Sequence, residues 1–174
     1  PISITFSSLT LLVSFIFAYH FIKDIHTPTV HINGKNWFTA AIVFNILSAA
    51  GTVILGYMMA TKNINQNVYL SSIYYYLHFQ YNGWFFFACM GLLVHAFNVV
   101  IPNYRENNIV FILFAGSCIP AFFLSVLFLK LPMWLYAIVV VSAIAQVIGW
   151  YKFLQATNKY RKEIIQKSSL LMKY

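Results

Sequence analysis

Five apolar runs, each long enough to cross a lipid bilayer, constrain this chain more than any other feature. A helix needs roughly 20 apolar residues to span the hydrocarbon core. The runs cover residues 2–22, 37–60, 71–101, 109–129 and 133–154. Because lipid offers no partners to unpaired backbone groups, runs this long and continuous predict α-helices. We therefore expect an all-α fold, a polytopic transmembrane bundle of five helices that belongs to a larger bundle.

The composition supports a membrane protein and argues against a soluble domain. Hydrophobic residues make up 61% of the chain and charged residues only 8%, whereas a soluble domain carries about 25% charged residues. The net charge of +8 is not read as a nucleic-acid signature, because the basic residues lie between the apolar runs and after the last one. The expected partners are therefore the lipid bilayer and other membrane helices or subunits, with no nucleic acid.

The distribution of Lys and Arg predicts an orientation. If the segment 156–174 is a basic cytoplasmic tail after a bundle at 1–155, most basic residues lie on the cytoplasmic side, as the positive-inside rule requires. A bacterial inner membrane is the expected location. The tail itself reads either as an amphipathic helix on anionic headgroups or as a solvated extension of the fifth helix. The residues on the cytoplasmic side would be Lys23, Lys35, Arg105, Lys159, Arg161, Lys162, Lys167 and Lys173, against Lys62 and Lys130 outside.

His78 is the polar residue in these runs that most needs an explanation, because an imidazole inside a membrane helix is costly to bury without a partner. It could be hydrogen-bonded to a neighbouring helix, or it could be an axial ligand to haem iron. Helical spacing places Asn82 on the same face and Gln80 on the opposite side. Polar groups on two faces indicate a helix surrounded by protein. Gly83 would let another helix or a cofactor edge approach the backbone closely.

Residues 76–93 resemble a segment of the haem-copper oxidase catalytic subunit (subunit I) superfamily. The family pattern is His-x-His on one helix, followed in small relatives by Gly-Trp. His78 matches the second histidine, and Gly83 and Trp84 match the Gly-Trp. The resemblance implies that His78 is a ligand to a low-spin haem b, with Gly83 and Trp84 in the same cofactor site. It also implies that these five helices correspond to the last five of twelve.

The sequence departs from the family at Tyr76, which stands where the histidine that binds the active-site haem is expected. Reduction of oxygen or nitric oxide is therefore doubtful, and no catalytic residue is assigned. A degenerate relative could keep one low-spin haem for electron transfer. The alternatives are a non-enzymatic structural subunit of a membrane complex, in which the polar patch joins helices, and a transporter fragment, in which it lines a path.

Two further patterns predict the architecture of the bundle. Pro120 lies inside the fourth run and should kink that helix, because proline lacks an amide N–H and its ring crowds the preceding turn. The segment 48–52, Ser-Ala-Ala-Gly-Thr, gives the second run a face of small residues. Small residues let membrane helices pack closely.

Overall fold

The computed structural model describes residues 2–27, 33–101, 104 and 108–171, and their side chains except those of 2–4, 7 and 162–171. These residues contain helices and turns and no strand. Five helical stretches are long and apolar enough to cross a membrane, which confirms the all-α transmembrane bundle. The elements are α1 (Ile2–Ile25), α2 (Lys35–Thr61), α3 (Gln66–His78), the π-helix η1 (Phe79–Phe85), α4 (Phe86–Val100), α5 (Asn108–Ala121), the 3-10 helix η2 (Phe122–Val126) and α6 (Met133–Leu171).

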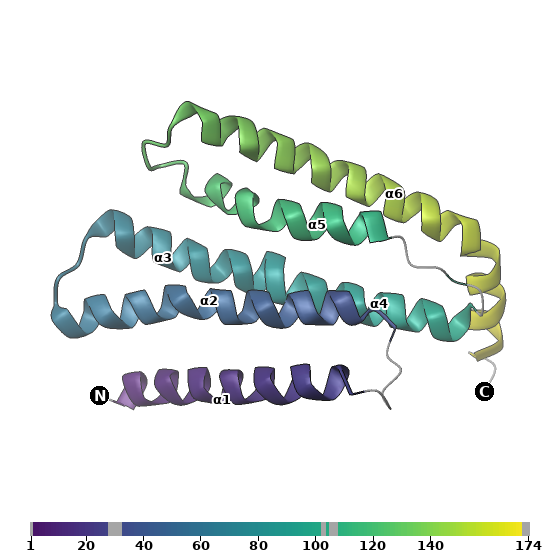
Figure 1. Ribbon diagram of the computed structural model, residues 1–174, viewed down its shortest axis with the longest axis horizontal. Helices are drawn as coiled ribbons and strands as arrows, with labels where there is room; N and C mark the ends of the chain where they lie inside the picture. Colours follow the sequence, from purple (N-terminus) through teal and green to yellow (C-terminus); the bar gives the residue numbers. More distant parts are fainter. Residues whose placement is uncertain (1, 28–32, 102–103, 105–107, 172–174) are drawn as a thin grey trace.

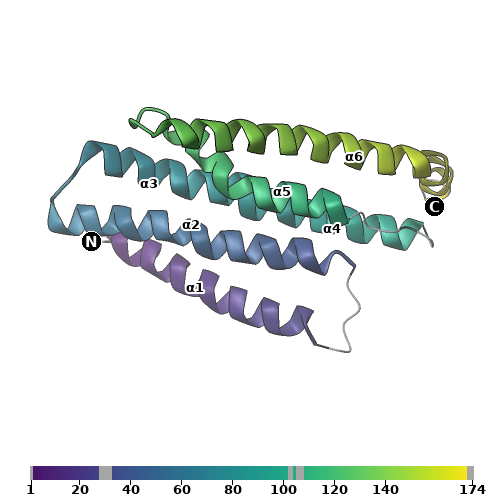
Figure 2. The same ribbon diagram turned by 45° about the horizontal axis from the view of Figure 1, so that its top comes forward.

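The spanning stretches lie side by side, and each runs antiparallel to the one before it (Figure 1). Helix α1 packs on α2, and α2 packs along the continuous stretch α3–η1–α4. Helix α5 packs on α6, and α3 meets η2. The turned view in Figure 2 shows the same succession from α1 to α6. Neighbours in sequence are therefore neighbours in space, as the short connections predict.

The third spanning stretch begins earlier than the sequence predicts, at Gln66 and not at residue 71. Asn65 caps it, because its side-chain oxygen accepts hydrogen bonds from the amides of Asn67 and Val68 at 3.0 and 3.2 Å. Such a cap satisfies amides that the first helical turn leaves without partners. His78 is consequently twelve residues from the start of its helix, about 18 Å at 1.5 Å per residue, and deeper than the sequence indicates.

The last two spanning stretches also differ from the predicted ranges. The run 109–129 forms α5 only to Ala121 and continues as the 3-10 helix η2. The change follows Pro120 directly, as expected where proline disturbs a helix. Helix α6 continues past residue 154 to Leu171, so the segment 156–174 begins inside a helix. In Figure 1 the yellow end of α6 turns away from the direction of its spanning part.

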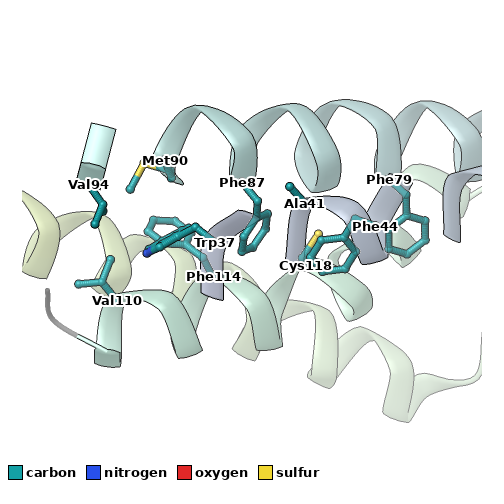
Figure 3. Packing of buried hydrophobic residues seen from close by; sticks show 10 residues of the cluster. All are labelled: Trp37, Ala41, Phe44, Phe79, Phe87, Met90, Val94, Val110, Phe114 and Cys118. Atoms are coloured by element: carbon teal, nitrogen blue, oxygen red, sulfur yellow. The ribbon is translucent and has the colours of Figure 1, made fainter. Parts of the chain in front are cut away.

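A cluster of buried side chains joins α2, η1, α4 and α5. Figure 3 shows its members: Trp37, Ala41, Phe44, Phe79, Phe87, Met90, Val94, Val110, Phe114 and Cys118. The Phe44 ring stacks on Phe79 with centroids 5.8 Å apart and meets Phe87 at 5.0 Å. The ring centroids of Trp37 and Phe87 are 5.5 Å apart. These contacts hold the middle three spanning stretches together and place the polar residues of η1 between α2 and α5.

Gly51 sets the distance between α2 and α3. A methyl group at this position would lie 2.6 Å from the Ser72 carbonyl oxygen and 2.9 Å from the Tyr76 amide nitrogen. Both are backbone atoms, which cannot turn aside as a flexible side chain can. The small-residue face predicted at 48–52 is therefore confirmed as a close helix contact.

We expect Gly51→Ala to destabilise the protein by about 1–3 kcal/mol, because α2 and α3 must separate to admit the methyl group. Gly56→Ala on the same helix is the matched control, since nothing lies within 4 Å of its added carbon. Its stability should change by less than about 1 kcal/mol. Thermal unfolding of the purified protein in detergent measures both. Equal stability of the two variants would contradict the close contact.

Candidate functional site

The π-helix η1 places the candidate site residues. It covers Phe79–Phe85 and lies between α3, which ends at His78, and α4. Short π-helical segments inside α-helices are rare and frequently occur at functional sites. The sequence did not predict this segment. Its only signal was the group Gln80, Asn82 and Gly83, which interrupts an apolar run.

His78 is buried, with 7% of its surface exposed, and both ring nitrogens have partners. Nε2 lies 2.8 Å from the Cys118 carbonyl oxygen, and Nδ1 lies 3.3 Å from Asn82 Nδ2. A carbonyl only accepts, so Nε2 carries the proton and donates it. In the neutral ring Nδ1 then holds a lone pair and accepts from the Asn82 amide. The expected placement of His78 and Asn82 on one face is confirmed.

Cys118 connects α5 to His78 and Asn82 through its backbone and its side chain. A carbonyl oxygen has two lone pairs. The Cys118 carbonyl oxygen can therefore accept a hydrogen bond from His78 and still accept one from an amide of its own helix. The Cys118 Sγ donates to the Asn82 carbonyl oxygen at 3.6 Å, a weak hydrogen bond. A cysteine inside an apolar run gives no sign of such a role in the sequence. The contact between Cys118 and His78 depends on how α5 packs against the third spanning stretch.

Gln80 makes a second polar joint on the opposite side of the same segment. Its Oε1 lies 2.9 Å from Ser48 Oγ on α2. The Ser48 hydroxyl is also 2.7 Å from the Asn45 carbonyl oxygen, so two acceptors share its single proton. Asn45 in turn donates through Nδ2 to Ser14 Oγ on α1 at 2.8 Å. Polar side chains therefore link α1, α2 and η1 in succession.

A cavity of about 360 Å³ lies beside His78, between the end of α3 and the elements η1, α4, α5, η2 and α6. Its polar lining residues come from α3, η1, η2 and α6, and none of the lining side chains is an acid, a lysine or an arginine. Aromatic rings supply much of the remaining wall. The lining residues are His78, Asn82, Ser125 and Gln146, then Phe86, Phe87, Phe114 and Trp150, and finally Cys118, Ala121 and Leu124.

The structure separates the three residues that the sequence groups in one haem site. His78 lines the cavity, whereas Gly83 and Trp84 do not. Gly83 lies against α2, where an added methyl group would come within 2.6 Å of the Phe44 Cβ. Trp84 is partly buried against the core cluster. The close approach expected at Gly83 is thus made by a helix.

The other histidines that the structure describes do not join this site. His20 is exposed on α1, and His95 is half-buried on α4 with no hydrogen-bond partner for Nδ1 among the described residues. In the described part of the chain, no three residues among His, Cys, Asp and Glu lie close enough together to hold a metal ion. The polar groups near His78 can donate and accept hydrogen bonds.

Comparisons with models of known protein families, with curated proteins and with solved structures find no match to this chain. The resemblance to haem-copper oxidases consequently stays a prediction from the residues at 76–93. The function proposed below therefore rests on the geometry around His78.

A double-mutant cycle tests the joint between Ser48 and Gln80. We expect Ser48→Ala and Gln80→Leu to be coupled by about 0.5–1.5 kcal/mol, because each change alone removes the same hydrogen bond. The control cycle pairs Ser48→Ala with Gln146→Leu, whose side chain lines the cavity on α6. Its coupling should be close to zero. Additive effects in the first cycle would show that this hydrogen bond does not stabilise the protein.

Proposed function

We propose that this integral membrane protein is a non-enzymatic structural subunit of a membrane complex, in which His78, where α3 meets η1, fastens this stretch to α5. The observation that carries the proposal is that both His78 nitrogens already have partners within the chain. A buried imidazole with both nitrogens bonded joins helices without needing a cofactor. The second joint, from Gln80 to Ser48, holds the opposite side of η1 to α2 in the same way.

The exposed apolar surface of α1 supports a place within a larger helical assembly. Helix α1 packs on α2, and 11% of the residues in its spanning segment Ser8–Ile25 are buried. Its Ser14 hydroxyl nevertheless receives a hydrogen bond from Asn45, so the helix is held in a definite position. Further membrane helices could pack on the remaining surface without disturbing this contact. Lipid would cover whatever they leave open.

The proposed orientation places residues 156–174 in the cytoplasm and the bundle in a bacterial inner membrane. This orientation is supported by the distribution of basic residues between the two ends of the bundle. Helix α1 ends, α2 begins and α6 ends at the same end (Figure 1). This end carries Lys23, Lys35 and Lys159, whereas the turns at the opposite end carry Lys62 and Lys130. An excess of basic residues on one side is the usual mark of the cytoplasmic face.

A low-spin haem b held by His78, with a role in electron transfer, is the second candidate. The aromatic cavity beside His78 is the observation that favours it. His78 is a suitable ligand by residue type, but its present hydrogen bonds do not fit the group. Nε2, the usual ligand atom in haem proteins, points to the Cys118 carbonyl, and Gly83 is closed off by Phe44. Binding would require His78 to give up its contact with α5.

The spectrum of the full-length protein distinguishes the two candidates. A structural role predicts no b-type haem band in the reduced-minus-oxidised spectrum of wild-type protein produced with ample haem. A band that is lost in His78→Ala and retained in His20→Ala would instead make haem binding the function. His20 is the matched control because it is an exposed histidine on α1.

The size of the native assembly tests the structural role directly. We expect the solubilised protein to migrate on native gels as an assembly larger than one chain in its micelle. His78→Ala should lower the free energy of unfolding by about 2 kcal/mol, because Cys118 and Asn82 lose a buried partner. The assembly should then dissociate at a lower temperature. His78→Gln, which can still donate to the carbonyl, should recover part of the loss. A monomeric wild type would rule the proposal out.

A further inference from the structure

The cavity beside His78 contains polar groups that the helix joints do not use. Gln146 on α6 and Ser125 on η2 both line it, and neither has a hydrogen-bond partner among the described residues. Gln146 lies thirteen residues into α6, about 20 Å along the helix and so near the middle of its span. An amide at this depth is costly to leave unpaired, because lipid cannot supply the missing bond.

The cavity walls restrict what could fill this space. No acidic or basic side chain other than the neutral His78 lines it, so a charged ligand would find no counter-charge. Phe86, Phe114 and Trp150 provide flat apolar faces, against which a ring packs well. The volume of about 360 Å³ lies within the range of small-molecule sites. The walls therefore favour an uncharged, flat molecule.

The rim of the cavity shows the side from which such a molecule would arrive. Leu124 and Trp150 line the cavity and are also 50% and 45% exposed on the outer surface of the bundle. Both belong to spanning stretches, so this surface faces lipid or a neighbouring helix. A molecule dissolved in the bilayer could reach the cavity sideways, without crossing the headgroup region.

The polar side chains of the cavity determine which polar group the molecule should carry. Because Nε2 of His78 donates to the Cys118 carbonyl at 2.8 Å, Nδ1 accepts one N–H of the Asn82 amide at 3.3 Å. The second N–H of this amide has no partner among the described residues, and neither has the Gln146 amide oxygen. A hydroxyl group could accept from Asn82 and donate to Gln146. An ether or a carbonyl could accept from Asn82 but would leave the Gln146 oxygen without a donor.

From these observations we propose that the cavity is a binding site for an uncharged, ring-shaped, hydroxyl-bearing molecule that enters from the membrane. Its hydroxyl group lies between the amides of Asn82 and Gln146, and its ring packs between α4, α5 and α6. Ser125 binds any further polar group on the ring. The bonds of His78 to Cys118 and Asn82 stay intact, so the helix joint and the binding site work together. This inference goes beyond the proposed structural role.

The test compares three probes on the wild-type protein in lipid nanodiscs, with empty nanodiscs to subtract partition into lipid. The probes are 2-naphthol, its methyl ether 2-methoxynaphthalene, and naphthalene. We expect 2-naphthol to bind at least about tenfold more tightly than either of the others, because a lost hydrogen bond to a buried partner is worth about that factor. Equal binding of 2-naphthol and its methyl ether would overturn the proposal.

A pair of tryptophan substitutions locates the site. Leu124→Trp fills the mouth of the cavity and should weaken 2-naphthol binding at least tenfold. Ile112→Trp is the matched control, because Ile112 is an exposed apolar residue in a separate groove between α5 and α6. It should leave binding unchanged. Gln146→Leu keeps the side-chain size and should remove the advantage of 2-naphthol over its methyl ether, because the amide that accepts from the hydroxyl is lost. Undiminished binding in Leu124→Trp, or an equal loss in Ile112→Trp, would place the probe elsewhere and refute this site.

Discussion

Lipid supplies no hydrogen bonds, so every polar group inside a spanning helix needs a partner within the protein. This constraint decides how the middle of the bundle is built. His78 meets it through a backbone carbonyl on α5, and Gln80 meets it through a hydroxyl on α2. Each bond joins a different pair of helices. The contacts that remove the polar penalty are therefore also the contacts that position α2, η1 and α5.

The π-helix gives these two joints their geometry. It lies in the middle of the third spanning stretch and carries Gln80 and Asn82, with His78 at its start. Gly83 lets Phe44 of α2 come within contact of the backbone. The Phe79 ring stacks on the same Phe44. Close packing on the α2 side and polar contacts on the α5 side thus hold one short segment from both directions.

The cavity exists because α6 does not fill the space that η1 and α5 leave open. The Cys118 carbonyl fixes the His78 tautomer, and Nδ1 then accepts one N–H of the Asn82 amide at the cavity wall. Gln146 contributes, from the far side, an amide that has no partner in the described part of the chain. A joint that holds two helices can in this way also prepare a hydrogen-bonding surface for a membrane-dissolved molecule. The structural role depends on the imidazole of His78, and the proposed binding role depends on the amides of Asn82 and Gln146.

Much of the architecture could be predicted from the sequence, because apolar run length and helical spacing are local properties. They predicted five spanning helices, the small-residue face at Gly51, the disturbance at Pro120 and the opposite placement of Gln80 and Asn82. The sequence pattern missed the cap at Asn65 and the continuation of α6 to Leu171. It also missed the π-helix, since an α-helix and a π-helix can be built from the same residues and packing selects between them.

The composition and the periodicity of this chain determined by themselves that it is a helical membrane protein with a polar patch around His78. Only the tertiary structure decided what that patch does. The partners of His78 and Gln80 are Cys118 and Ser48, which lie 40 and 32 residues away. No local pattern encodes such pairs, because they depend on how whole helices dock. Docking also separated Gly83 and Trp84 from the cavity that His78 lines, although the three are close neighbours in sequence.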